Sequence, residues 1–221
     1  MLNDTLISRR VAAQSAGFTI LNAALIGYSS YDYVNVVNHF TEGKYDSFDI
    51  KRVTLFYCLN DIYSKFKDRP LPDSRLSNAL RSILDFLNQY CRTYLFIKHQ
   101  ILDHSKSYFL YDEQLYDPAH PELMASILDI LAINDKCKNL NIEFEVALLP
   151  YEYQLRNYSN KTYHKPQILM QIVLREKNIK VYDCMEFLKH YPGKAEDLYM
   201  PGDGIHFLIW GHRILVSERT A

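Results

Sequence analysis

The sequence predicts an α/β fold in which helices cover both faces of a parallel sheet. Short apolar runs rich in β-branched and aromatic residues alternate with longer segments whose apolar residues recur at helical spacing. The short runs are continuously apolar, which is typical of strands that are buried on both faces. A length of 221 residues, of which 48% are hydrophobic, suits one domain with a sizeable core. We therefore expect residues 1–221 to form a single domain.

The first half of the chain predicts two strands and three helices. In chain order, these are a helix at 4–16, a strand at 18–24, a helix at 30–40, a strand at 52–58 and a helix at 74–90. The first helix begins at a capping Asp4 and ends before Gly17, because Asp favours the start of a helix and Gly its end. The helix at 74–90 follows a proline-bounded loop and carries an amphipathic stripe of leucine and isoleucine.

The second half repeats the alternation after one irregular segment. In chain order, we expect a helix at 122–140, a strand at 142–149, a helix at 166–177, a strand at 179–183 and one or two helical turns at 184–190. Residues 99–120 have weak periodicity and are rich in Tyr, Asp and Ser. We interpret that segment as an insertion or lid that borders the substrate pocket and shapes specificity.

Composition limits the partners and cofactors. A formal net charge of −1 gives no electrostatic basis for binding nucleic acid or an anionic membrane. We find no run long enough to span a membrane and no signal peptide. The eight histidines lack metal-ligand spacing, so we expect neither a metal nor an organic cofactor. The four cysteines form no CxxC pair, which suits free thiols in a reduced compartment such as the cytoplasm.

The most informative stretch is Asp203-Gly-Ile-His206, which follows a Pro-Gly turn and precedes an apolar run at 207–210. We expect that run to open a closing helix. An Asp just before a helix and a His in its first turn can meet side chain to side chain. The carboxylate would then fix the imidazole tautomer and leave the second ring nitrogen as a general base. The alternative is an Asp helix cap beside a surface His.

Two further residues follow predicted strands, where ligands bind in parallel sheets. Gly27 lies after the run at 18–24 and offers a backbone N–H where a side chain would obstruct a ligand. Asn60 follows the strand at 52–58 and can donate its amide to a developing oxyanion. The alternatives are a turn glycine for Gly27 and a helix cap for Asn60.

Taken together, these stretches resemble the SGNH (GDSL-type) hydrolases, a superfamily of serine esterases and acyltransferases. The run Asn22-Ala-Ala-x-x-Gly27 is similar to the family's Asn-Ala-Gly-x-x-Gly turn, and Cys58-Leu-Asn-Asp61 to its Gly-x-Asn-Asp block. Asp203-Gly-Ile-His206 fits its Asp-x-x-His block, and Gly211-His212 behind it is also similar. The resemblance covers residues 4–219 and implies a three-layer α/β/α, flavodoxin-like fold with a parallel sheet.

The resemblance also implies roles for four residues and a class of substrate. His206 would be the general base and Asp203 its orienting partner. The N–H of Gly27 and the side chain of Asn60 would form the oxyanion hole. The substrate would be a small-molecule, carbohydrate or lipid ester, attacked through a serine acyl-enzyme without a cofactor. The alternative is a non-catalytic remnant or ligand-binding domain of the same fold.

One block of the family has no counterpart here. In the family a first strand ends in Gly-Asp-Ser and supplies the nucleophile, whereas the only Gly-Asp pair of this chain is at Gly202 and is followed by Gly204. We therefore expect the first strand and the nucleophile to be missing, and the chain as given to be inactive. Cys58 and Ala24 also replace glycines of the family pattern.

None of the serines near the expected site is assigned as a nucleophile. Ser8 and Ser15 lie in the predicted first helix, away from any strand end. Ser29 and Ser30 follow a predicted strand, and we expect Ser30 to cap the next helix.

Overall fold

The computed structural model of the chain describes residues 21–23, 27–42, 49–63, 86, 91, 103–208 and 211. The predicted helix at 4–16 lies outside these residues, as does the helix at 74–90 apart from Phe86. Of the predicted strand at 18–24 the structure describes residues 21–23, and these are not in a strand.

Three parallel strands form one sheet in the order β1-β2-β3. They are β1 (Arg52–Cys58), β2 (Glu143–Leu149) and β3 (Lys180–Asp183). Cys58 is paired with Leu149, and Leu148 with Asp183, so the strands end level with one another. Three of the four expected strands are confirmed as parallel strands of one sheet, and with them an α/β fold. The segments that follow β1 and β2 consequently leave the sheet at the same edge.

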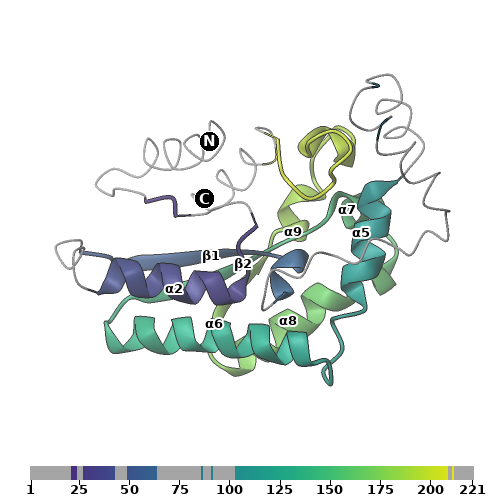
Figure 1. The fold of residues 1–221 in the computed structure, drawn as a ribbon. Helices are drawn as coiled ribbons and strands as arrows, with labels where there is room; N and C mark the ends of the chain where they lie inside the picture. Colours follow the sequence, from purple (N-terminus) through teal and green to yellow (C-terminus); the bar gives the residue numbers. More distant parts are fainter. Residues whose placement is uncertain are drawn as a thin grey trace.

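Helices pack on both faces of β2. The helices α2 (Ser30–Thr41), α6 (Pro121–Asn139) and α8 (Lys165–Glu176) lie on one side of the sheet, below it in Figure 1. Three alternate residues of β2 join the main core on that side: Phe144, Val146 and Leu148. Ala147 belongs to a second cluster with α9 (Met185–Leu188) and η4 (Ala195–Leu198). The apolar run at residues 146–149, at the end of β2, is thereby explained, because both faces of the strand are covered.

Four shorter elements lie where the strands end. They are η2 (Leu59–Ile62), α5 (His104–Glu113), α7 (Glu152–Arg156) and η3 (Lys161–His164). In Figure 1, α5 and α7 stand beyond the carboxyl ends of the strands. Within the part of the chain that the structure describes, none of the helices has the length and apolar content needed to cross a bilayer.

The segment at 99–120 contains a helix that its weak periodicity did not indicate. Residues 104–113 form helix α5, and the side chains of Phe109 and Tyr116 are fully buried in the main core. The Tyr116 hydroxyl donates to the carbonyl of Leu59 over 2.9 Å and so ties this segment to the end of β1. Two of its aromatic residues therefore fill the interior, while the interpretation of this stretch as an insertion or lid that borders a substrate pocket stays a prediction.

The expected start of a closing helix at 207 is also not found. Phe207 forms an isolated antiparallel bridge with Tyr199, and the two rings pack 4.5 Å apart. The next residue, Leu208, donates its N–H to the carbonyl of Leu198 over 2.7 Å. The apolar run therefore begins as an extended segment that packs on η4, and residues 209–210 lie outside the described part.

Candidate functional site

Asp203 and His206 meet side chain to side chain in a tight turn. The Nδ1 atom of His206 lies 2.5 Å from Oδ2 of Asp203. The other carboxylate oxygen, Oδ1, accepts the N–H groups of Ile205 and His206 over 2.7 and 3.0 Å. The contact expected from the Asp-x-x-His spacing is confirmed, although it forms in a turn and not at the start of a helix. Gly202 and Gly204 have φ of +77° and +68°, which explains the two glycines around Asp203.

The turn keeps Asp203 ionised and leaves the histidine open to solvent. Burial alone would raise the pKa of Asp203, but hydrogen bonds from the His206 ring and from backbone N–H groups outweigh it and lower that pKa. The His206 side chain is 44% exposed and that of Asp203 is 28% exposed. Because Nδ1 faces the carboxylate, Nε2 is the ring atom that this arrangement presents as a base.

This turn is attached to the edge at which the strands end. The carbonyl of Gly204 accepts the N–H of Glu152, three residues after the last residue of β2, over 2.9 Å. Ile205 packs against the main core. The Asp203–His206 pair therefore lies at the carboxyl edge of the sheet, where ligands bind in open α/β folds.

Asn60 lies in η2, directly after β1, and does not cap that helix. The side chain that caps the start of η2 is that of Asp61, because its Oδ2 accepts the N–H of Cys58 over 2.8 Å. The side-chain oxygen of Asn60 is buried and has no hydrogen-bond partner among the residues that the structure describes. A buried amide oxygen without a partner is costly, and such atoms in native structures call for an explanation beyond stability.

Asp61 is a second carboxylate of the site, and the sequence argument did not single it out. Its Oδ2 also accepts the Tyr33 hydroxyl over 3.0 Å, which fixes the start of α2 beside the end of β1. Burial raises the pKa of Asp61 to about 7, while the Cys58 N–H, the Tyr33 hydroxyl and His206 lower it. The influence of His206 shows that the imidazole and this carboxylate are within electrostatic range of one another. The signal in the sequence that could have indicated this role is the position of Asp61, three residues after the strand end at Cys58.

Gly27 occupies a turn at the start of the same region. Its φ of +88° lies in the left-handed range, so a glycine is needed there whatever its N–H does. The next residue, Tyr28, packs edge to face on Tyr33 with ring centroids 6.3 Å apart. The rings of Tyr28 and Tyr33 therefore connect the Gly27 turn to Asp61. The role of the Gly27 N–H in an oxyanion hole stays a prediction.

The two serines beside this turn are engaged in structure. Ser29, and not Ser30 as expected, is the N-cap of α2, and its hydroxyl and N–H both donate to Asp32 over 2.9 Å. The buried Ser30 hydroxyl donates to Asp129 on α6 over 2.8 Å. Cys58 is no substitute nucleophile, since burial raises the pKa of its thiol well above the usual value.

The buried carboxylate of Asp112 links α5 to the carboxyl edge of the sheet. Asp112 of α5 is fully buried and accepts the Tyr63 hydroxyl over 2.6 Å and the Tyr151 hydroxyl in a short hydrogen bond. These bonds join α5 to the segments that follow β1 and β2. Sequence reasoning missed this group because its partners are 49 and 39 residues away in the chain.

The described residues form no metal site, and comparison with known proteins gives no relative. Among the described residues, no group of three or more His, Cys, Asp or Glu is arranged to hold a metal ion. Within the described part of the chain, none of the four cysteines is in a disulfide. A scan against protein-family models, a search of curated proteins and a search of solved structures each found no match to the chain.

Proposed function

We propose that this chain carries the general base and the oxyanion donors of a serine ester hydrolase or acyltransferase of the SGNH type, with a three-layer α/β/α fold. His206 is the base and Asp203 orients it, while Asn60 and the N–H of Gly27 face the developing oxyanion. The substrate is a small-molecule, carbohydrate or lipid ester. The proposal rests chiefly on the 2.5 Å contact between His206 Nδ1 and Asp203 Oδ2 at the carboxyl edge of a parallel sheet.

In this mechanism, Nε2 of His206 takes the proton of a serine hydroxyl while the hydroxyl oxygen attacks the ester carbonyl. Asp203 stabilises the imidazolium that forms, and its lowered pKa keeps it anionic at neutral pH. The tetrahedral adduct then expels the alcohol of the ester, which takes the proton from Nε2 and leaves the acyl group on the serine. Water or a second alcohol, activated in turn by Nε2, then releases the acyl group from the serine. We assign no serine of the chain to the attack. Without one, the imidazole acts at best on water, and losing a triad member leaves about 10³–10⁴-fold catalysis over the uncatalysed reaction.

The second candidate is a domain of the same fold that binds a ligand without chemistry. The observation that favours it is the engagement of both serines beside the Gly27 turn, Ser29 with Asp32 and Ser30 with Asp129. A fold that kept the Asp203–His206 turn and lost its nucleophile would look the same at these positions.

A fluorophosphonate probe separates these possibilities, because it reacts only with an activated serine. The purified 221-residue chain is tested beside a longer form, where the gene encodes residues upstream of Met1. We expect no labelling of the 221-residue chain and stoichiometric labelling of the longer form. Labelling of neither form favours the binding domain. Stoichiometric labelling of the 221-residue chain at Ser15, Ser29 or Ser30 contradicts our conclusion that no serine of this chain is the nucleophile.

A further inference from the structure

Gly204 is one of the points at which the Asp203–His206 turn touches the rest of the protein. It is buried, although His206 two residues later is exposed. A Cβ atom on Gly204 would lie 2.3 Å from Cβ and 2.5 Å from Oγ of Ser105, in the first turn of α5. On the α7 side, the Gly204 carbonyl accepts the N–H of Glu152. The turn is therefore in van der Waals contact with α5 and hydrogen-bonded to α7.

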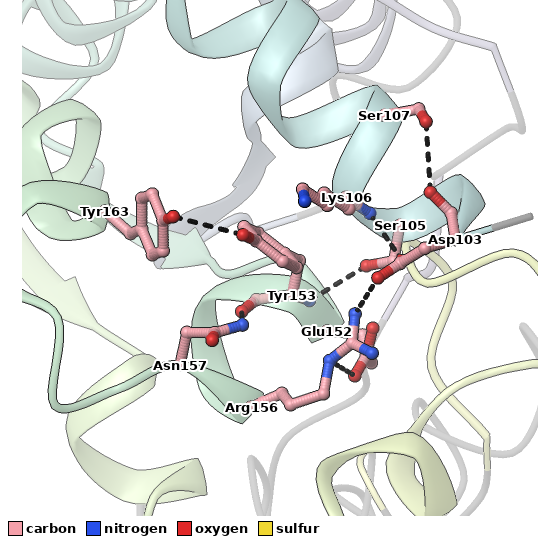
Figure 2. Close-up of polar contacts among 9 residues, drawn as sticks. All are labelled: Asp103, Ser105, Lys106, Ser107, Glu152, Tyr153, Arg156, Asn157 and Tyr163. Atoms are coloured by element: carbon pink, nitrogen blue, oxygen red, sulfur yellow. Dashed lines mark hydrogen bonds and ion pairs between the residues drawn. The ribbon is translucent and has the colours of Figure 1, made fainter.

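The two helices that hold the turn are themselves joined by polar contacts, which Figure 2 shows. The Ser105 hydroxyl accepts the N–H of Tyr153 over 2.8 Å. Arg156 donates to Asp103, the N-cap of α5, over 2.7 Å and forms an ion pair of 3.1 Å with Glu152. We call Asp103, Ser105, Glu152 and Arg156 the α5–α7 bracket.

The buried members of the bracket lie closest to the turn. Ser105 is 6% exposed and Glu152 is 4% exposed, so the contacts of both residues with Gly204 are shielded from bulk solvent. Burial raises the pKa of Glu152, and the Ser105 hydroxyl and Arg156 oppose that rise. A buried carboxylate and a buried hydroxyl held in this way resist displacement, because each would lose a partner that water does not replace.

We propose that Ser105 is a positioning residue for the Asp203–His206 pair, acting through its contact with Gly204. This inference rests on the proposed function, since it concerns how that pair is aligned. The turn packs against the Cβ of Ser105 at Gly204. The hydroxyl of Ser105 accepts the Tyr153 N–H and so fixes the first turn of α7. In that same turn, the Glu152 N–H donates to the Gly204 carbonyl. A side chain without the hydroxyl, or a larger one, moves Asp203 relative to the imidazole.

The test compares two positions of the same helix. Ser105→Val and Ser105→Ala are made in the 221-residue chain, with Ser107→Val as the matched control. The Ser107 side chain is exposed and its hydroxyl donates to the backbone carbonyl of Asp103, the N-cap of the same helix. Both readouts come from nuclear magnetic resonance. One is the low-field proton on Nδ1 of His206, and the other is the hydrogen-exchange rate of the Ile205 and His206 amides, which donate to Asp203.

We expect Ser105→Val to abolish the low-field Nδ1 signal and to speed exchange of both amides at least tenfold, with no change in Ser107→Val. Unchanged signals and rates in a folded Ser105→Val protein overturn the proposal. If that variant does not fold, Ser105→Ala decides. It should speed the two amides about threefold, and unchanged rates there overturn the proposal as well. Neither readout needs catalysis, so failure here is distinguishable from failure of the labelling test.

Discussion

Replacing Asp61 by Asn should stabilise the protein at pH 8 by about 4 kcal/mol and change its stability by less than about 1 kcal/mol at pH 4. Burial raises the pKa of this carboxyl from 3.8 to about 7. Each unit of pKa corresponds to about 1.4 kcal/mol, so a rise of about three units gives the figure of about 4 kcal/mol. The asparagine oxygen can accept the same Cys58 N–H and Tyr33 hydroxyl, so the variant removes the charge and keeps the hydrogen bonds.

The sign follows from which state holds the proton. Between about pH 4 and pH 7 the unfolded chain has lost the Asp61 proton while the folded protein retains it. The stability of the wild-type protein therefore falls across this window relative to the variant, and the difference levels off above the folded pKa. Other groups near Asp61 contribute to its titration: His206 and Tyr33 lower its pKa and Asp112 raises it.

Urea unfolding at half-unit steps from pH 4 to pH 8 measures the difference. Asp135→Asn, at an exposed position of α6, is the matched control and should run parallel to the wild type. A constant offset between Asp61→Asn and the wild type at all pH values would refute the reasoning, because a carboxyl with an unshifted pKa contributes no slope in this range.

Three further substitutions test the packing and the site. Gly204→Ala should destabilise the protein by about 1–3 kcal/mol in urea unfolding, since it combines a left-handed φ with contact to α5, whereas Gly193→Ala meets only the end of a flexible tyrosine ring and should cost less. Phe109→Ala should lower the free energy of unfolding by about 3–5 kcal/mol, because Phe109 is fully buried. Tyr111 is 37% exposed, so Tyr111→Ala should lower it much less. Equal losses for the two variants would show that α5 is no part of the core. In a fluorophosphonate-reactive form, Asn60→Ala should lower kcat by roughly 10²–10³ with KM nearly unchanged, and an unchanged kcat would remove it from the oxyanion hole.

The strands and the longer helices were predictable because their signals are local. The apolar run at residues 146–149, at the end of β2, reports burial on both faces, and the helix predicted at 122–140 is found as α6. The bounds observed for β1 equal those predicted from its β-branched and aromatic residues. Most of the buried residues of these elements are apolar, so the pattern of hydrophobicity largely follows the pattern of burial, although Glu145, Ser126 and Asn134 are buried as well.

Helix α5 was missed for the opposite reason. Its buried residues, Ser105, Phe109 and Asp112, do recur at helical spacing, but two of the three are polar. A hydrophobic pattern cannot reveal a face that is buried through hydrogen bonds to residues far away in the chain. The same polar burial makes α5 the support for the Asp203–His206 turn and for the segment after β1.

The candidate site was predictable only where its geometry is local. Asp203 and His206 are three residues apart, and the glycines on either side of Asp203 indicated a turn. Asp61 and Tyr33 are 28 residues apart, and nothing in either local sequence shows that they meet. Asp61 was accordingly overlooked beside Asn60, although its hydrogen bonds to Cys58 and Tyr33 hold together the start of α2 and the end of β1.

The dependence of serine labelling on His206 tests the central claim most directly. In the form of the protein that reacts with a fluorophosphonate, His206→Gln should reduce the rate of labelling by at least about 10³-fold, because the base that activates the serine is lost. His190→Gln, at an exposed histidine of the same chain, should leave the rate unchanged. Equal labelling rates for His206→Gln and the unaltered protein would contradict the account.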